Sequence, residues 1–160
     1  MRPMVILVGV FGCAVGAAAP PTEVSPNDPV ARLRSAHTLR CHFTAEATTK
    51  WTNGRRTIAS DNLSGQARAN EITYDSIDLK RGTARAIGNA GAADVTVKVD
   101  RMGALWMVET VPMGYLVVTT IIPNYAADST DFIIIESRHT WLPSAYALGT
   151  QDSGTCSVLG

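Results

Sequence analysis

Ser137, Arg138 and His139 form the group in this 160-residue chain whose types most resemble catalytic machinery. With Asp131 or Glu136 they supply the residue types of a Ser-His-acid hydrolase. Ser137 and His139 are two residues apart, so on a strand they share one face, whereas a nucleophile and its base normally come from separate elements. The chain has no Gly-x-Ser-x-Gly turn. We therefore expect a polar strand end and no enzyme, with a hydrolase using Ser137 and His139 as the alternative.

Metal binding is the second chemistry to consider. The chain has three histidines, His37, His42 and His139. A zinc site needs three or four converging ligands, and no His-x-His or His-Glu-x-x-His spacing brings these together. We expect surface histidines, no metal site and no cofactor.

The three cysteines say more about the cellular location than about catalysis. Cys13 lies in an apolar leader, which leaves Cys41 and Cys156 as an even pair. A thiol nucleophile at Cys41 helped by His42 is disfavoured, because adjacent strand residues point to opposite faces. Paired cysteines are typical of an oxidising, exported compartment. We predict a Cys41–Cys156 disulfide that ties the two ends of the domain together.

The N-terminus predicts export. Residues 1–18 have the order of a signal peptide: one positive charge at Arg2, an apolar stretch, and small residues with cleavage expected after Ala17 or Ala18. The apolar stretch is too short to span a bilayer, which needs about 20 residues. The alternative is a lipid anchor, in which Cys13 becomes the acylated first residue.

The rest of the chain reads as one domain. Residues 19–27 are rich in proline and polar residues and predict a flexible spacer, and residues 28–160 form a single domain of ordinary size. Loss of Arg2 with the leader leaves 13 basic residues against 14 acidic ones. This balance predicts neither nucleic-acid binding nor a polybasic membrane patch.

Alternating apolar and polar residues predict strands over most of the domain. Leu39, Cys41, Phe43 and Ala45 would lie on the inner face of the first strand, with Glu46 among the polar residues opposite. An Asn53-Gly54 pair predicts a hairpin turn. Further strands are expected at residues 72–77, 83–88, 94–100, 105–111, 115–122 and 132–139.

Short strands with regular turns predict an all-β domain. We expect an antiparallel meander of about eight strands closed into a small barrel or a barrel-like sandwich, with Cys41 at the head of the first strand and Cys156 beyond the last. One short helix is expected at residues 29–37, capped by Asp28 with Pro29 at its first position.

The sequence resembles a family of uncharacterised exported bacterial β domains over residues 39–156. The resemblance rests on seven runs: Leu39 to Thr44; Trp51 with Asn53, Gly54 and Arg55; Asp75 to Leu79; Ala84 to Asn89 with Gly91 to Val95; Ser137 to His139; Pro143 to Tyr146; and Gly154 to Cys156. It implies secretion and a small β domain and carries no assigned activity. The segment between Tyr146 and Cys156 is longer than the family pattern.

A binding role fits these features best. A small barrel can hold an apolar ligand in its mouth or present a face to an envelope protein. The candidate contact residues are Trp51 and Trp141, expected at element ends, with Arg138 and His139. Apolar runs such as 132–135 would need cover on both faces, which makes a homodimer one option. The remaining alternative is a lipid-anchored structural or assembly factor of the envelope.

Overall fold

The structure is a computed structural model that describes residues 28–63, 70–111, 115–126, 129–142 and 146–159. Its elements are α1 (Pro29–Ser35), β1 (Leu39–Thr52), β2 (Arg55–Asn62), β3 (Glu71–Asp78), β4 (Thr83–Gly88), β5 (Gly91–Val99), β6 (Leu105–Val111), β7 (Tyr115–Ile122), β8 (Phe132–Leu142) and β9 (Tyr146–Val158). The predicted leader, its Cys13 and the spacer lie outside the described residues. Within the described ranges, no helix has the length and apolar character needed to cross a lipid bilayer.

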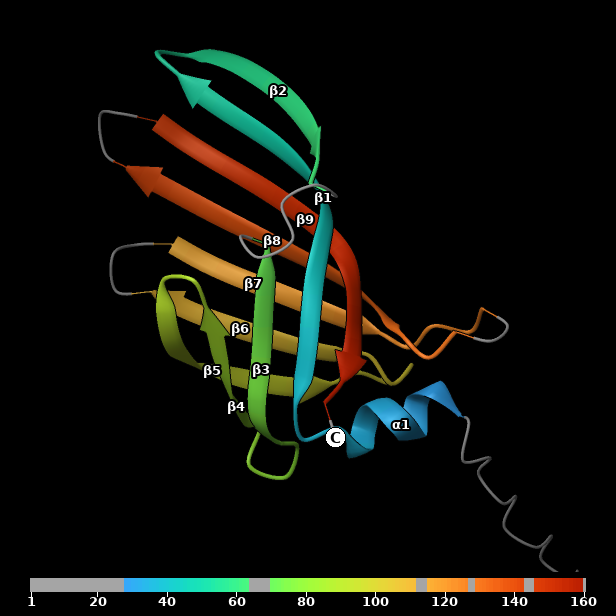
Figure 1. Cartoon of the computed structure of the whole chain (residues 1–160). Coiled ribbons are helices and arrows are strands. Elements are labelled where there is room, and N and C mark those ends of the chain that lie inside the picture. The colour runs from blue at the N-terminus through green and yellow to red at the C-terminus, as the bar shows by residue number, and fades with distance from the viewer. Residues whose placement is uncertain (1–27, 64–69, 112–114, 127–128, 143–145, 160) are drawn as a thin grey trace, which may run out of the picture.

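The strands form one antiparallel sheet in the order β2-β1-β3-β4-β5-β6-β7-β8-β9, and β1 also pairs with β9. That last pairing closes eight strands into a barrel, with β2 as an added ninth strand (Figure 1). Closure removes the unpaired edges that an open meander would expose. The predicted all-β antiparallel barrel is therefore confirmed.

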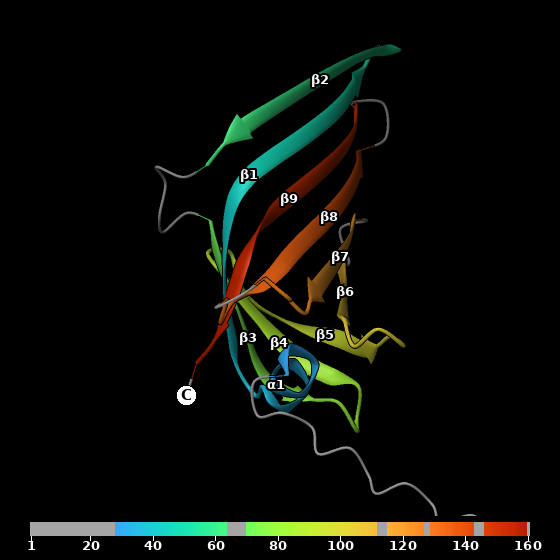
Figure 2. The same ribbon diagram turned by 90° about the vertical axis from the view of Figure 1, so that its right-hand side faces the viewer.

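Helix α1 covers one end of the barrel (Figure 2). The Asp28 side chain accepts a hydrogen bond from the Val30 N–H at 3.0 Å and caps the helix as predicted. Leu33 is fully buried within the apolar core. The Arg32 guanidinium donates to the Thr130 carbonyl and lies 5.3 Å from the centre of the Phe132 ring. This end of the barrel is thus closed by packing and by a cation–π contact.

The disulfide lies inside the sheet. Cys41 and Cys156 are directly opposed on β1 and β9, both are buried, and they form the predicted bond. The expectation that Cys156 lies beyond the last strand is wrong, because the segment after Tyr146 forms β9 and pairs with both β1 and β8.

A β-bulge changes which side chains of β1 point inward. Leu39, Cys41 and Phe43 are buried as predicted, but the register with β9 shifts between Phe43 and Ala45. One extra residue reverses the alternation of faces beyond it. Ala45 is consequently exposed, while Glu46 turns to the inner face. The predicted faces of Ala45 and Glu46 are therefore the reverse of those observed.

The neighbour of β1 also changes at the bulge. Residues 39–42 pair with β3, whereas residues 45–52 pair with β2. Strands β1, β8 and β9 continue past the short strands β3, β4 and β5, so the barrel end opposite α1 is open on that side (Figure 1). This open end contains the candidate site.

Candidate functional site

A cavity of about 710 Å³ occupies the open end of the barrel. One wall comes from the inner faces of β1, β7, β8 and β9, and the other from the start of β3 and the β4–β5 turn. Its apolar lining includes Tyr115, Val117 and Leu148. Small-molecule sites in proteins have volumes of about 300–1,000 Å³, so the cavity has the size of a ligand site.

Three carboxyl side chains form a row across the inner wall. Glu46 on β1 is directly opposite Asp152 on β9, and Asp152 is directly opposite Glu136 on β8. Directly opposed side chains in an antiparallel pair have Cβ atoms about 4.5–5.5 Å apart, and like charges there are unfavourable. The row therefore concentrates negative charge along this wall of the cavity.

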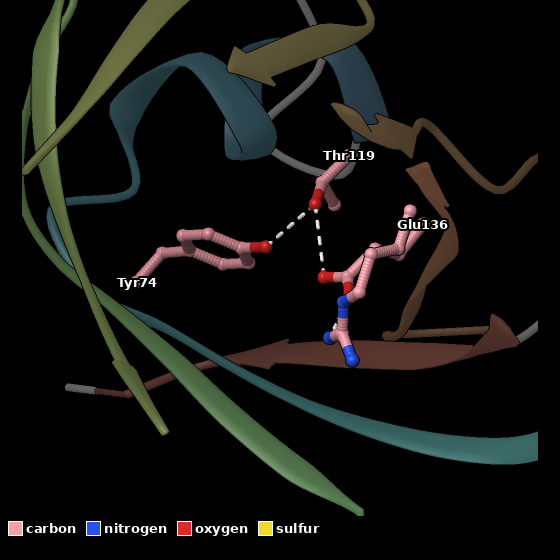
Figure 3. A network of polar contacts seen from close by, with 4 residues as sticks. Tyr74, Thr119 and Glu136 are labelled. Carbon is pink, nitrogen blue, oxygen red and sulfur yellow. Dashed lines mark hydrogen bonds and ion pairs between the residues drawn. The ribbon is translucent and has the colours of Figure 1, made fainter. Parts of the chain in front are cut away.

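A buried polar network holds one end of this row (Figure 3). The Tyr74 hydroxyl donates to Thr119 Oγ1 at 2.8 Å, and the Thr119 hydroxyl donates to Glu136 at 3.1 Å. The other Glu136 oxygen accepts from the Arg138 guanidinium at 2.8 Å. All but Arg138 are at most 2% exposed. Burial, and next the Glu136 charge, raise the pKa of Tyr74 far above its ordinary range, so the phenol stays a donor.

Asp152 has the least compensated charge in the row. Its side chain is 8% exposed. Burial, followed by the neighbouring Glu46 and Glu136 charges, raises its pKa from 3.8 to about 6, against an opposing effect of Arg138. The group is therefore poised to gain or lose a proton, or to accept a positive partner, near neutral pH.

The structure places Ser137 and Glu136 on opposite faces of β8. On β8, Glu136 and Arg138 point into the cavity, whereas Ser137 and His139 are on the outer face. Glu136 is thus on the wrong face to serve as their acid. Ser137 Oγ accepts a 3.5 Å hydrogen bond from the Gln151 side chain. Ser137 and His139 share a face as predicted, but strand alternation separates them from the buried carboxyl group.

The histidines do not converge. His42 pairs with Thr155 and His139 with Gly149, both facing outward. At about 3.3 Å per residue, six residues along β9 separate them by roughly 20 Å. Among the described residues, no group of three or more His, Cys, Asp and Glu side chains could hold a metal ion.

The two tryptophans share the outer face. Trp51 on β1 and Trp141 on β8 flank Ala147 of β9 in one cross-strand row, and they are 46% and 64% exposed. The Arg56 guanidinium lies 5.8 Å from the Trp51 ring centre. Of the four predicted contact residues, Trp51, Trp141 and His139 therefore share the outside, while Arg138 belongs to the cavity.

Comparison with protein-family models, with curated proteins and with solved structures finds no match to this chain. The resemblance to exported bacterial β domains stays a prediction from sequence.

Sequence patterns did not identify most of the cavity lining, including Glu46 and Asp152, nor the Tyr74 and Thr119 hydroxyls that hold Glu136. In β8 and β9, polar residues alternate with other residues along the strand, a pattern that by itself predicts that the polar side chains face solvent. The inward direction of Asp152 follows from the pairing of β8 with β9, and that of Glu46 from the bulge in β1. The one local signal is that Glu136 and Arg138 continue the phase of Phe132 and Ile134, which predicts an inner face.

Proposed function

We propose that the protein is an exported binding module that holds a small molecule in the open end of its barrel. The observation that carries the proposal is the cavity of about 710 Å³, whose wall combines apolar side chains with the buried polar groups of Glu136 and Asp152. Binding sites combine an apolar lining with a few placed polar groups in this way. An eight-stranded barrel is just wide enough to hold one small ligand.

Export is part of the proposal. It is supported by the signal-peptide pattern of residues 1–18 and by the Cys41–Cys156 disulfide, a bond typical of oxidising compartments. We do not extend the proposal to hydrolysis at Ser137, since the buried carboxyl group of Glu136 and the Ser137 hydroxyl lie on opposite faces of β8.

The test is native mass spectrometry of the full chain purified from its own host. A cleaved leader, an intact disulfide and a bound small molecule are expected, and an acyl group on Cys13 would identify the lipid-anchored alternative. An Ala93→Phe variant should lose the bound mass, because Ala93 lines the cavity. Ala126→Phe places the same ring at an exposed position away from the cavity and should keep the bound mass. Wild-type protein without bound mass, or ligand retained by Ala93→Phe, would refute the proposal.

Contact with a second copy of the chain is a second candidate function, favoured by the outer row of Trp51, Ala147 and Trp141. Two exposed tryptophans on either side of a small residue form a broad apolar surface, and tryptophan is enriched at interfaces. Sedimentation of wild-type protein should show reversible association that a Trp51→Ser, Trp141→Ser double variant loses. Equal sedimentation of the two proteins would exclude this surface as a self-interface.

A further inference from the structure

Unpartnered polar atoms gather at the cavity. Among the described residues, the buried side-chain polar atoms with no hydrogen-bond partner are Asn70 Nδ2, Thr150 Oγ1 and Asp152 Oδ1. All three side chains line the same cavity. Buried polar groups in folded proteins nearly always have a hydrogen-bond partner. Several unpaired polar atoms around one cavity therefore indicate a site where a ligand can supply the missing hydrogen bonds.

The charge of the wall indicates what kind of ligand. The charged side chains of the described lining are five acidic ones and a single basic one, Arg138: the acids are Glu46, Glu71, Glu109, Glu136 and Asp152. Arg138 is already bound to Glu136 at 2.8 Å. Glu46 and Asp152 are directly opposed on β1 and β9, so two acidic side chains meet at this point of the lining. A positive group would relieve this repulsion.

The donors and acceptors narrow the chemistry further. Asp152 Oδ1 and Thr150 Oγ1 can both accept from an N–H donor, and the two residues are adjacent on the inner face of β9. A primary ammonium group carries three such donors. Asn70 Nδ2 can donate to an oxygen elsewhere on the ligand. Tyr115, Val117 and Leu148 offer apolar contact for its carbon skeleton.

Building on the proposed function, we infer that the cavity binds a small amphipathic molecule carrying a protonated amine. Asp152 and Glu46 neutralise the ammonium group, and Thr150 accepts one of its hydrogen bonds. The Tyr74–Thr119–Glu136–Arg138 network lies alongside and holds Glu136 in place, and Arg138 offsets the Glu136 charge, which leaves Asp152 and Glu46 as the partners of the ammonium group.

The experiment compares three probes with one skeleton and different ends: tyramine with an ammonium group, tyrosol with a hydroxyl, and 4-hydroxyphenylacetate with a carboxylate. Each is titrated at millimolar concentrations into the folded, disulfide-bonded domain near neutral pH while backbone amide shifts are recorded. Tyramine should shift the amides of Thr150, Asp152 and Glu136, and should bind about tenfold or more tightly than tyrosol. The carboxylate probe should bind more weakly still.

Asp152→Asn keeps the shape of the side chain and removes its charge, so it should reduce tyramine affinity about tenfold with little effect on tyrosol. Asp94→Asn is the matched control, because Asp94 is exposed on β5 and does not line the cavity. It should bind tyramine like the wild type.

Two results would overturn the inference and leave the proposed function standing. In the first, tyrosol or 4-hydroxyphenylacetate binds the cavity as tightly as tyramine. In the second, Asp152→Asn binds tyramine as tightly as Asp94→Asn does. Absence of any tyramine shift at the cavity also overturns it, and the bound mass in native protein then decides separately whether the cavity is a site at all.

Discussion

Gly154 of β9 lies against the backbone of His42 on β1, so closely that no other residue fits. A Cβ added to Gly154 would overlap the carbonyl oxygen of His42 and lie 2.8 Å from the Cα of Phe43. This contact occurs at the register shift between Phe43 and Ala45. The missing side chain therefore permits the bulge that turns Glu46 into the cavity.

Substitution of Gly154 should be strongly destabilising. Gly154→Ala forces two backbones apart, and we expect a loss of about 3 kcal/mol in the free energy of unfolding, measured by urea denaturation. Gly149→Ala on the same strand is the control, because a Cβ there meets nothing within 4 Å. It should change stability by less than about 0.5 kcal/mol. Equal urea midpoints for the two variants would contradict the close approach.

The disulfide should supply a large share of the stability. It joins residues 115 positions apart, and a crosslink that closes a loop of this length contributes about 4–5 kcal/mol by restricting the unfolded chain. A Cys41→Ala, Cys156→Ala double variant should show this loss in thermal or chemical unfolding. Wild-type protein in reducing agent should approach the variant, while the variant itself should not respond to reductant. A wild-type midpoint that is the same in both conditions would count against the bond.

The buried network predicts that its members differ in how much their substitution lowers the free energy of unfolding. Thr119→Val preserves shape but leaves both the Tyr74 hydroxyl and a Glu136 oxygen short of a partner, so it should cost about 2–3 kcal/mol. Tyr74→Phe removes one bond and leaves Thr119 donating to Glu136, so it should cost about 1 kcal/mol. Tyr125→Phe, at an exposed position, is the control. A cost for Tyr74→Phe equal to that of Thr119→Val would show that Thr119 does not link the two groups.

Asp152 should make the folded state less stable as pH rises. Its folded pKa of about 6 lies above the ordinary 3.8, so between these values the folded protein holds a proton that the unfolded chain releases. The penalty is absent below about pH 4 and complete above about pH 6. Solvent screening at the open end of the barrel reduces this penalty to about 1–2 kcal/mol. Asp152→Asn should accordingly raise stability at pH 7.5 and flatten the profile from pH 4 to 6, relative to Asp94→Asn. An unchanged profile would show that Asp152 is not buried with like charges.

The barrel could be predicted from the sequence, because alternating apolar residues and one cysteine pair indicate its strands and its closure. Val95 and Val97 are buried on one face of β5 as their alternation predicts, and the Cys41–Cys156 pairing brings the first and last strands together. Helix α1 begins at Pro29 after Asp28, as capping chemistry requires. These features depend on local spacing or on one covalent bond, which is why they can be inferred without a structure.

Strands β2 and β9 do not show the alternation of apolar and polar residues that predicts the other strands. Every residue of β2 is exposed, so no buried face imposes an alternation. Strand β9 is rich in glycine and polar residues, including Gly149 and Gly154, which have low strand propensity. Both strands are held by their neighbours. The carboxyl row is hard to predict from sequence for the same reason. The inward direction of Glu46 depends on the bulge in β1, which the close contact with Gly154 permits.

Binding of an amine should itself depend on pH. Tyramine stays protonated across pH 5–7, since an alkylammonium group loses its proton only near pH 10. Asp152 changes from mostly protonated at pH 5 to mostly ionised at pH 7, given its pKa of about 6. The affinity of wild-type protein for tyramine should therefore rise about tenfold over this range. Asp152→Asn should show a flat profile at the weaker affinity, whereas Asp94→Asn should follow the wild type. A rise of the same size in Asp152→Asn would assign the titration to another group and remove Asp152 as the ammonium partner.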